Sequence, residues 1–138
     1  MKVLLLLLPL LIGQAQQAPK NDPNGIWKST DPELSDSRYE IRLSGSDLTV
    51  KLVPGSNPKF LEYEVNMKNE KEVNTYKGTG FMVAKMSGGK ECKLPVQWLF
   101  VVLTKDRLIG EATQLTADSK TCAVREQIQV KLDLTRDK

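Results

Sequence analysis

The chain has 138 residues, enough for one domain with a modest core, and a formal net charge of +3. This mild basicity is spread along the chain, which argues against the concentrated positive face of a nucleic-acid-binding protein. The sequence contains no histidine, and so lacks the usual general base, the usual zinc ligand and the ordinary catalytic triads.

The N-terminal segment is typical of a secretory signal peptide over residues 1–15. A lysine at position 2 precedes an apolar run over 3–12, and small residues follow at 13 and 15. This run is too short for a membrane span, which needs roughly twenty apolar residues. We therefore expect a secreted or periplasmic protein, with a flexible, proline-containing arm over 16–24 and a folded domain over 25–138.

The rest of the chain alternates short β-type segments with turn-forming residues. The expected strands cover residues 25–29, 38–43, 48–52, 60–67, 73–86, 94–103, 108–115 and 122–134. In the fifth of these strands, Gly78 and Gly80 predict a bulge or a close approach of two backbones. No segment keeps a helical period over three turns.

The strand at 94–103 is the most apolar of the series. One of its faces carries Val96, Trp98, Phe100 and Val102, and the other carries Leu99, Val101 and Leu103. A strand that is apolar on both faces is expected to be covered on both, so the remaining chain should wrap around it.

Eight strands joined by short links predict an all-β fold, and specifically an antiparallel up-and-down β-barrel. Closure into a barrel removes the exposed edges that an open meander would leave. A β-sandwich is the alternative, but its crossover connections need longer links than this sequence offers. In the barrel, the longer links gather at one end and the shorter links at the other.

The two cysteines, Cys92 and Cys122, both fall at the end with the longer links. In an exported chain a disulfide between them is expected. One strand lies between theirs, so they start about 10 Å apart at the usual strand spacing. Because a disulfide bridges Cα atoms at most about 7 Å apart, the loops must bend inward to join them.

Three features resemble the calycin superfamily, the lipocalins and their small-barrel relatives. They are the Gly-x-Trp of Gly25 and Trp27 at the first strand, a loose Thr-Asp turn over 102–106, and Arg136 just past the last strand. The resemblance implies structural roles for these residues, with Arg136 packed over Trp27 at the end with the short links. A stacked cation of this kind contributes about 0.5–2 kcal/mol. Unlike that family, this chain has no helix after the barrel strands.

The inward residues of an eight-stranded barrel either fill its core or line a cavity. The candidate ligand-binding residues are Tyr39, Tyr63, Trp98, Phe100, Glu126 and Ile128. Glu126 stands out as a carboxylate on an otherwise apolar face near the long-link mouth. It either holds the polar head of a ligand or reaches water at the end of its strand.

Two functions follow as hypotheses. The resemblance and the cavity argument imply a secreted or periplasmic lipocalin-like protein that binds a small hydrophobic ligand. The alternative is an extracellular protein-interaction barrel, an inhibitor or an envelope partner, with a filled core. Its partner, or a second copy of the chain, would bind the outward row Leu99, Val101 and Leu103. We expect no enzyme, cofactor or metal site, because the acids alternate outward and no base accompanies a nucleophile.

Overall fold

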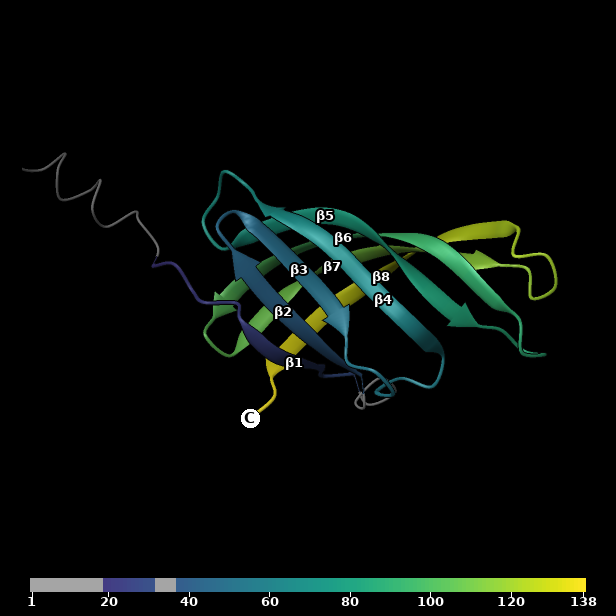
Figure 1. Ribbon diagram of the computed structural model, residues 1–138. Coiled ribbons are helices and arrows are strands. Elements are labelled where there is room, and N and C mark those ends of the chain that lie inside the picture. Colours follow the sequence, from purple (N-terminus) through teal and green to yellow (C-terminus); the bar gives the residue numbers. More distant parts are fainter. Residues whose placement is uncertain (1–18, 32–36) are drawn as a thin grey trace, which may run out of the picture.

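The structure is a computed structural model that describes residues 19–31 and 37–138, and it is a closed antiparallel barrel (Figure 1). Its strands are β1 (Gly25–Ser29), β2 (Arg38–Ser44), β3 (Asp47–Leu52), β4 (Phe60–Asn69), β5 (Thr75–Lys85), β6 (Glu91–Thr104), β7 (Arg107–Ala117) and β8 (Val124–Arg136). Each strand pairs with the next, and β8 pairs with β1. The barrel predicted from the sequence is confirmed, and the sandwich is not formed. No helix of the described residues has the length and apolar character to cross a membrane.

Successive connections lie at alternate ends of the barrel, as the meander requires, but the predicted sorting by length is incomplete, because the β4–β5 and β5–β6 connections both span five residues. The β2–β3, β4–β5 and β6–β7 turns are short and lie at one end, which we call the closed end. The β3–β4, β5–β6 and β7–β8 connections lie at the opposite, open end. The β2–β3 turn depends on Gly45, whose φ of 64° is a left-handed conformation that favours glycine.

The core is formed by alternate residues that point into the barrel. On β6, Trp98 and Phe100 are almost completely buried, whereas Leu99 and Leu103 are 42% and 46% exposed. The expectation that both faces of this strand are covered is therefore wrong. A closed barrel has a single sheet, so the outer face of each strand meets no second layer.

Trp27 fills the closed end of the barrel. Its side chain is fully buried, and its Nε1 donates a hydrogen bond to the carbonyl of Pro23 at 2.9 Å. The Arg136 guanidinium lies 4.5 Å from the centre of the indole ring, so the predicted cation–π contact is confirmed. Gly25 makes room for it, because a Cβ atom at that position would lie 2.6 Å from Nη1 of Arg136.

The segment before β1 is held against the closed end. The Asn21 backbone N–H donates to Asn74 Oδ1 at 2.7 Å, and Arg136 donates to two carbonyls of this segment. These bonds join residues 19–24, the described part of the predicted flexible arm (16–24), to the β4–β5 turn and to β8. The predicted signal peptide, residues 1–15, lies outside the described residues.

We expect the substitution Arg136→Ala to lower the free energy of unfolding by about 2 kcal/mol, because it removes a cation–π contact and hydrogen bonds to three carbonyls. Arg136→Lys keeps the charge but not the planar fork, so it should fall between the alanine variant and wild type. Urea denaturation followed by tryptophan fluorescence measures both. A cost for the alanine variant within about 0.5 kcal/mol of zero, the usual range for surface changes, would contradict this role.

At the open end the sheet divides into two projecting hairpins. The β5–β6 ladder continues up to the Lys85–Glu91 pair, but the β6–β7 ladder ends at Gln97 and Thr113. Pro95 lies two residues beyond this last pair and has no backbone N–H to donate. The tips of the β5–β6 and β7–β8 hairpins consequently extend past the rest of the barrel, at the right of Figure 1.

A disulfide between Cys92 and Cys122 joins these two hairpins, with the Cα atoms 5.4 Å apart. The predicted pairing is confirmed, and it favours an oxidising compartment. The β7–β8 turn that carries Cys122 is held by Asp118, which accepts hydrogen bonds from the Lys120 N–H at 2.8 Å and from Arg125 at 2.6 Å. These bonds hold the pKa of Asp118 at about 2.

Gly78 and Gly80 lie in regular register with Met67 and Val65 of β4, so β5 has no bulge there. A Cβ atom on Gly80 would lie 1.8 Å from the carbonyl oxygen of Glu64. Of the two alternatives predicted for these glycines, the close backbone approach is the one that the structure contains.

Candidate functional site

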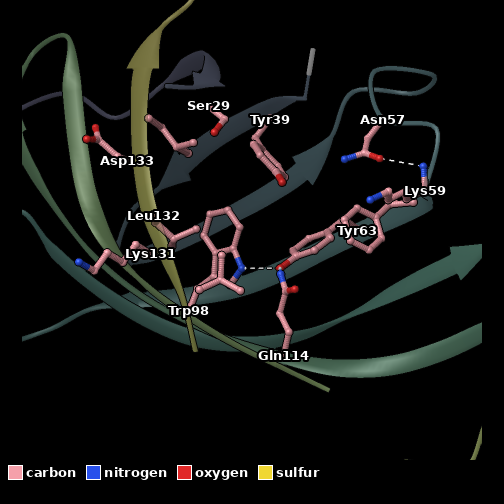
Figure 2. A pocket seen from close by; sticks show the side chains of 13 residues that line it. Ser29, Tyr39, Asn57, Lys59, Tyr63, Trp98, Gln114, Lys131, Leu132 and Asp133 are labelled. Carbon is pink, nitrogen blue, oxygen red and sulfur yellow. Dashed lines mark hydrogen bonds between the residues drawn. The ribbon is translucent and has the colours of Figure 1, made fainter. Parts of the chain in front are cut away.

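A cavity of about 190 Å³ lies inside the barrel toward the open end, between β8 and the rim formed by β1 to β4 (Figure 2). Its inner wall is aromatic and its outer part is formed by the inward residues of β8. The residues that define it best are Tyr39, Phe60, Tyr63, Trp98, Val130 and Leu132.

The aromatic wall is a cluster of rings in edge-to-face contact. The ring centre of Trp98 lies 5.4 Å from that of Tyr39 and 5.7 Å from that of Tyr63. Phe60 extends the cluster toward the mouth, 5.7 Å from Tyr63. Such pairs are favourable by about 0.5–1.5 kcal/mol beyond the burial of their area, so the wall is preorganised.

The polar atoms of the cavity meet at the Tyr63 hydroxyl. Trp98 Nε1 donates to this oxygen at 2.8 Å, and Gln114 Nε2 donates at 2.9 Å (Figure 2). Two donors use both acceptor positions of a hydroxyl, so the Tyr63 O–H has its proton left to donate. Burial raises the pKa of Tyr63, so the phenol stays protonated at neutral pH.

The chemistry that this arrangement offers is binding. It combines flat apolar walls with one fixed O–H donor, and the side chains of Lys131 and Asp133 point away from the cavity in Figure 2. Within residues 19–31 and 37–138, no group of three or more His, Cys, Asp or Glu side chains could hold a metal ion.

We expect the protein to lose stability above about pH 10, the usual pKa of a phenol. Burial raises the pKa values of Tyr39 and Tyr63, so the fold favours their neutral forms. This contribution is complete below the unfolded-state pKa and is lost as the pH rises toward the higher folded-state values. Tyrosinate absorbance and denaturant midpoints across alkaline pH test this. Full titration of all tyrosines near pH 10 without unfolding would contradict it.

Three of the predicted ligand-binding residues, Tyr39, Tyr63 and Trp98, lie together in the cavity wall. Phe100 is buried but lies nearer the closed end, where its ring packs 5.5 Å from that of Tyr76. Gly25, Trp27 and Arg136, which the resemblance gives structural roles, lie together at the closed end.

Glu126 and Ile128 are not where the sequence placed them. Ile128 is 38% exposed, and Glu126 is also exposed on the projecting part of β8. Of the two alternatives for Glu126, the one that places it in water is the one observed. Alternation along β8 indicates on which face each residue lies. Beside Glu126 and Ile128, however, no described residue of β1 pairs with β8, so the inward face of β8 is not covered from that side.

Further residues of the site were missed, among them Gln114, Phe60, Val130 and Leu132. Gln114 lies in register with the inward residues of β7, so a polar residue at an inward position was the available signal. Phe60 was hidden by the bulge between it and Glu62, which changes the alternation of β4. No pattern in the sequence indicates this bulge.

A second hollow of about 450 Å³ lies on the outer wall, over β6, β7 and β8. Leu99, Val101 and Ile109 line it, together with Gly110, which has no side chain to fill it. Leu103, the third residue of the predicted partner surface, is exposed further along β6 and does not line this hollow.

Comparisons with protein-family models, with curated proteins and with solved structures found no match for this chain.

Proposed function

We propose that the protein binds a small, mainly apolar molecule in the 190 Å³ cavity and serves as its carrier or scavenger outside the cell or in the periplasm. The observation that carries this proposal is the aromatic cavity inside a barrel whose other end is closed by Trp27. A dry apolar cavity of about 150 Å³ accommodates benzene, whereas drug-sized ligands need about 300–1,000 Å³. The ligand is therefore a single-ring compound, with an acceptor atom for the Tyr63 hydroxyl.

Two further observations support a lipocalin-like protein of the secretory route. The Arg136–Trp27 contact reproduces, at the closed end, the arrangement that the resemblance to lipocalins implies. The Cys92–Cys122 disulfide is of the kind formed in oxidising compartments, consistent with the signal-peptide pattern of residues 1–15.

Titration with acetophenone, a single ring with a carbonyl acceptor, tests the binding proposal. We expect quenching of tryptophan fluorescence and a retained adduct in native mass spectrometry. The substitution Val130→Phe should weaken binding tenfold or more, because the new ring occupies the cavity. Val101→Phe, on the outer wall, is the matched control and should bind as wild type does. Equal binding by both variants, or no binding of single-ring compounds by wild type, would overturn the proposal.

The second candidate function is a protein-interaction barrel. It is favoured by the outer hollow, whose apolar lining includes Leu99, 42% exposed, and Ile109, 37% exposed. If this surface binds a second copy, native mass spectrometry should show a dimer that increases with concentration and is lost in Leu99→Lys. Gln97→Lys, an outward change on the same strand, is the control.

A further inference from the structure

One side of β8 has few hydrogen-bond partners. On its β7 side the strand is paired over its full length, from Thr135 to Val124. On its other side, the described residues of β1 pair with β8 from Arg136 to Leu134, and the Thr30 N–H adds a bond to the carbonyl of Asp133 at 3.0 Å. Toward the hairpin tip, no described residue bonds this side of residues 124–132, which we call the unpaired edge.

The hydrogen bonds of β8 show toward which neighbouring strand each main-chain N–H and C=O group points. The carbonyl of Asp133 faces β1, whereas the N–H groups of Glu126 and Arg136 face the β7 side. Because hydrogen-bonding direction alternates along a strand, odd-numbered residues of β8 point their N–H and C=O groups toward the unpaired edge. The residues with groups directed there are Gln127, Gln129 and Lys131.

The sequence after β1 lacks the donor that the next β1–β8 pair would need. In the β1–β8 register, Thr30 is opposite Asp133, and the next hydrogen-bonded pair would join position 32 to Lys131. Position 32 is proline, which has no N–H and cannot donate to the Lys131 carbonyl. The β1–β8 ladder therefore has no N–H donor for Lys131, the residue at which the unpaired edge approaches β1.

The cavity of the proposed function opens beside this edge. Lys131 and Asp133 line the cavity although their side chains point away from it in Figure 2, so they present their main chain. The residues between and beside them on the strand, Val130 and Leu132, face inward and line the same space. A strand laid along the edge would point every second side chain toward the cavity.

We propose that the unpaired edge of β8 binds an extended peptide segment by strand addition, with one apolar or aromatic side chain of the peptide in the cavity. Main-chain hydrogen bonds to Gln127, Gln129 and Lys131 supply affinity, and the cavity selects the side chain. This inference rests on the proposed function for the cavity and adds to it a second class of ligand, a peptide whose side chain enters the space that the single-ring compound would occupy, and a second set of contacts.

Hydrogen exchange on the wild-type protein tests the inference directly. The probe is a short capped peptide in which threonine alternates with valine around one central phenylalanine. We expect the peptide to slow exchange of the Gln127, Gln129 and Lys131 amides. The Ile128 and Val130 amides should change little, because they already face β7. Slowing spread equally over odd and even residues, or absent from the odd ones, would overturn the inference.

The substitution Gln129→Pro removes one edge-directed N–H while leaving the β7 ladder intact, since proline is tolerated on strand edges. Its matched control is Gln129→Ala, which loses the side-chain contact to Thr113 but keeps the N–H. We expect Gln129→Pro to bind the peptide at least tenfold more weakly than Gln129→Ala, a loss of about 1.4 kcal/mol. Both variants should bind acetophenone as wild type does.

The outcomes separate the two proposals. Equal peptide affinity of the two Gln129 variants overturns strand addition and leaves the cavity proposal standing. Loss of acetophenone binding in Val130→Phe together with retained peptide binding shows that no peptide side chain uses the cavity, which also overturns the inference. If free protein forms a dimer that already protects the three edge amides and excludes the peptide, a second copy is the occupant and the inference is wrong.

Discussion

Replacing Gly80 with alanine is expected to lower the free energy of unfolding by about 4 kcal/mol or more, which is exceptional for the addition of one methyl group. The added Cβ would lie 1.8 Å from the carbonyl oxygen of Glu64 and 2.7 Å from the Cα of Val65. Both contacts are with backbone, so no side chain can rotate to relieve them. The β4 and β5 strands would have to separate, and the cost is that of overpacking a rigid interior.

Chemical denaturation of Gly80→Ala and of a control glycine variant measures this effect. Gly45→Ala is the control, because a Cβ there meets nothing within 4 Å and only the left-handed φ of 64° is unfavourable. It should cost about 1–2 kcal/mol. If both variants are destabilised equally, the close approach of β4 and β5 is not what requires glycine at position 80.

Removal of the disulfide, by the double substitution Cys92→Ser and Cys122→Ser, is expected to cost about 3 kcal/mol in the chain-entropy account of cross-links. The structure adds a local effect. The β6–β7 ladder stops at Gln97, so the disulfide is a covalent bridge between two hairpin tips that the ladder no longer joins. Amides near the tips should exchange faster in the variant, while those near Trp27 keep their protection.

The matched control for this prediction is Lys90→Ala. It removes another contact between the tips, a hydrogen bond of 2.8 Å from Lys90 Nζ to the carbonyl of Lys120. An exposed contact of this kind should be worth less than about 1 kcal/mol. Uniformly faster exchange throughout the barrel of the double variant would show that the disulfide acts on the unfolded chain alone.

Local patterns in the sequence were enough to determine the architecture. Strict alternation over residues 38–43 and 48–52, the apolar run over 94–103 and the turn residues between strands predicted the eight strands and their order. The closed end was also predictable, because Trp27 and Arg136 occupy fixed places in a meander of that direction. These features depend on side-chain period and link length, both of which are written in consecutive residues.

The candidate site was only partly predictable. Tyr39, Tyr63 and Trp98 were found because each is an aromatic residue at an inward position of a regular strand. Phe60 was missed because a bulge reversed its face, and the ligand-binding alternative for Glu126 failed because β8 continues beyond the described part of β1. Alternation assigns a face to each residue but does not say whether another strand covers that face.

The sequence by itself therefore determined the barrel, its two ends and the pairing of its cysteines. The tertiary structure alone decided the 190 Å³ cavity, the separate hairpins at the open end and the unpaired edge of β8. The reason is physical: side-chain alternation is a property of each strand, whereas cavities and edges arise from differences in length between strands that are distant in sequence. The five residues of β1 beside the thirteen of β8 are such a difference, and no local pattern records it.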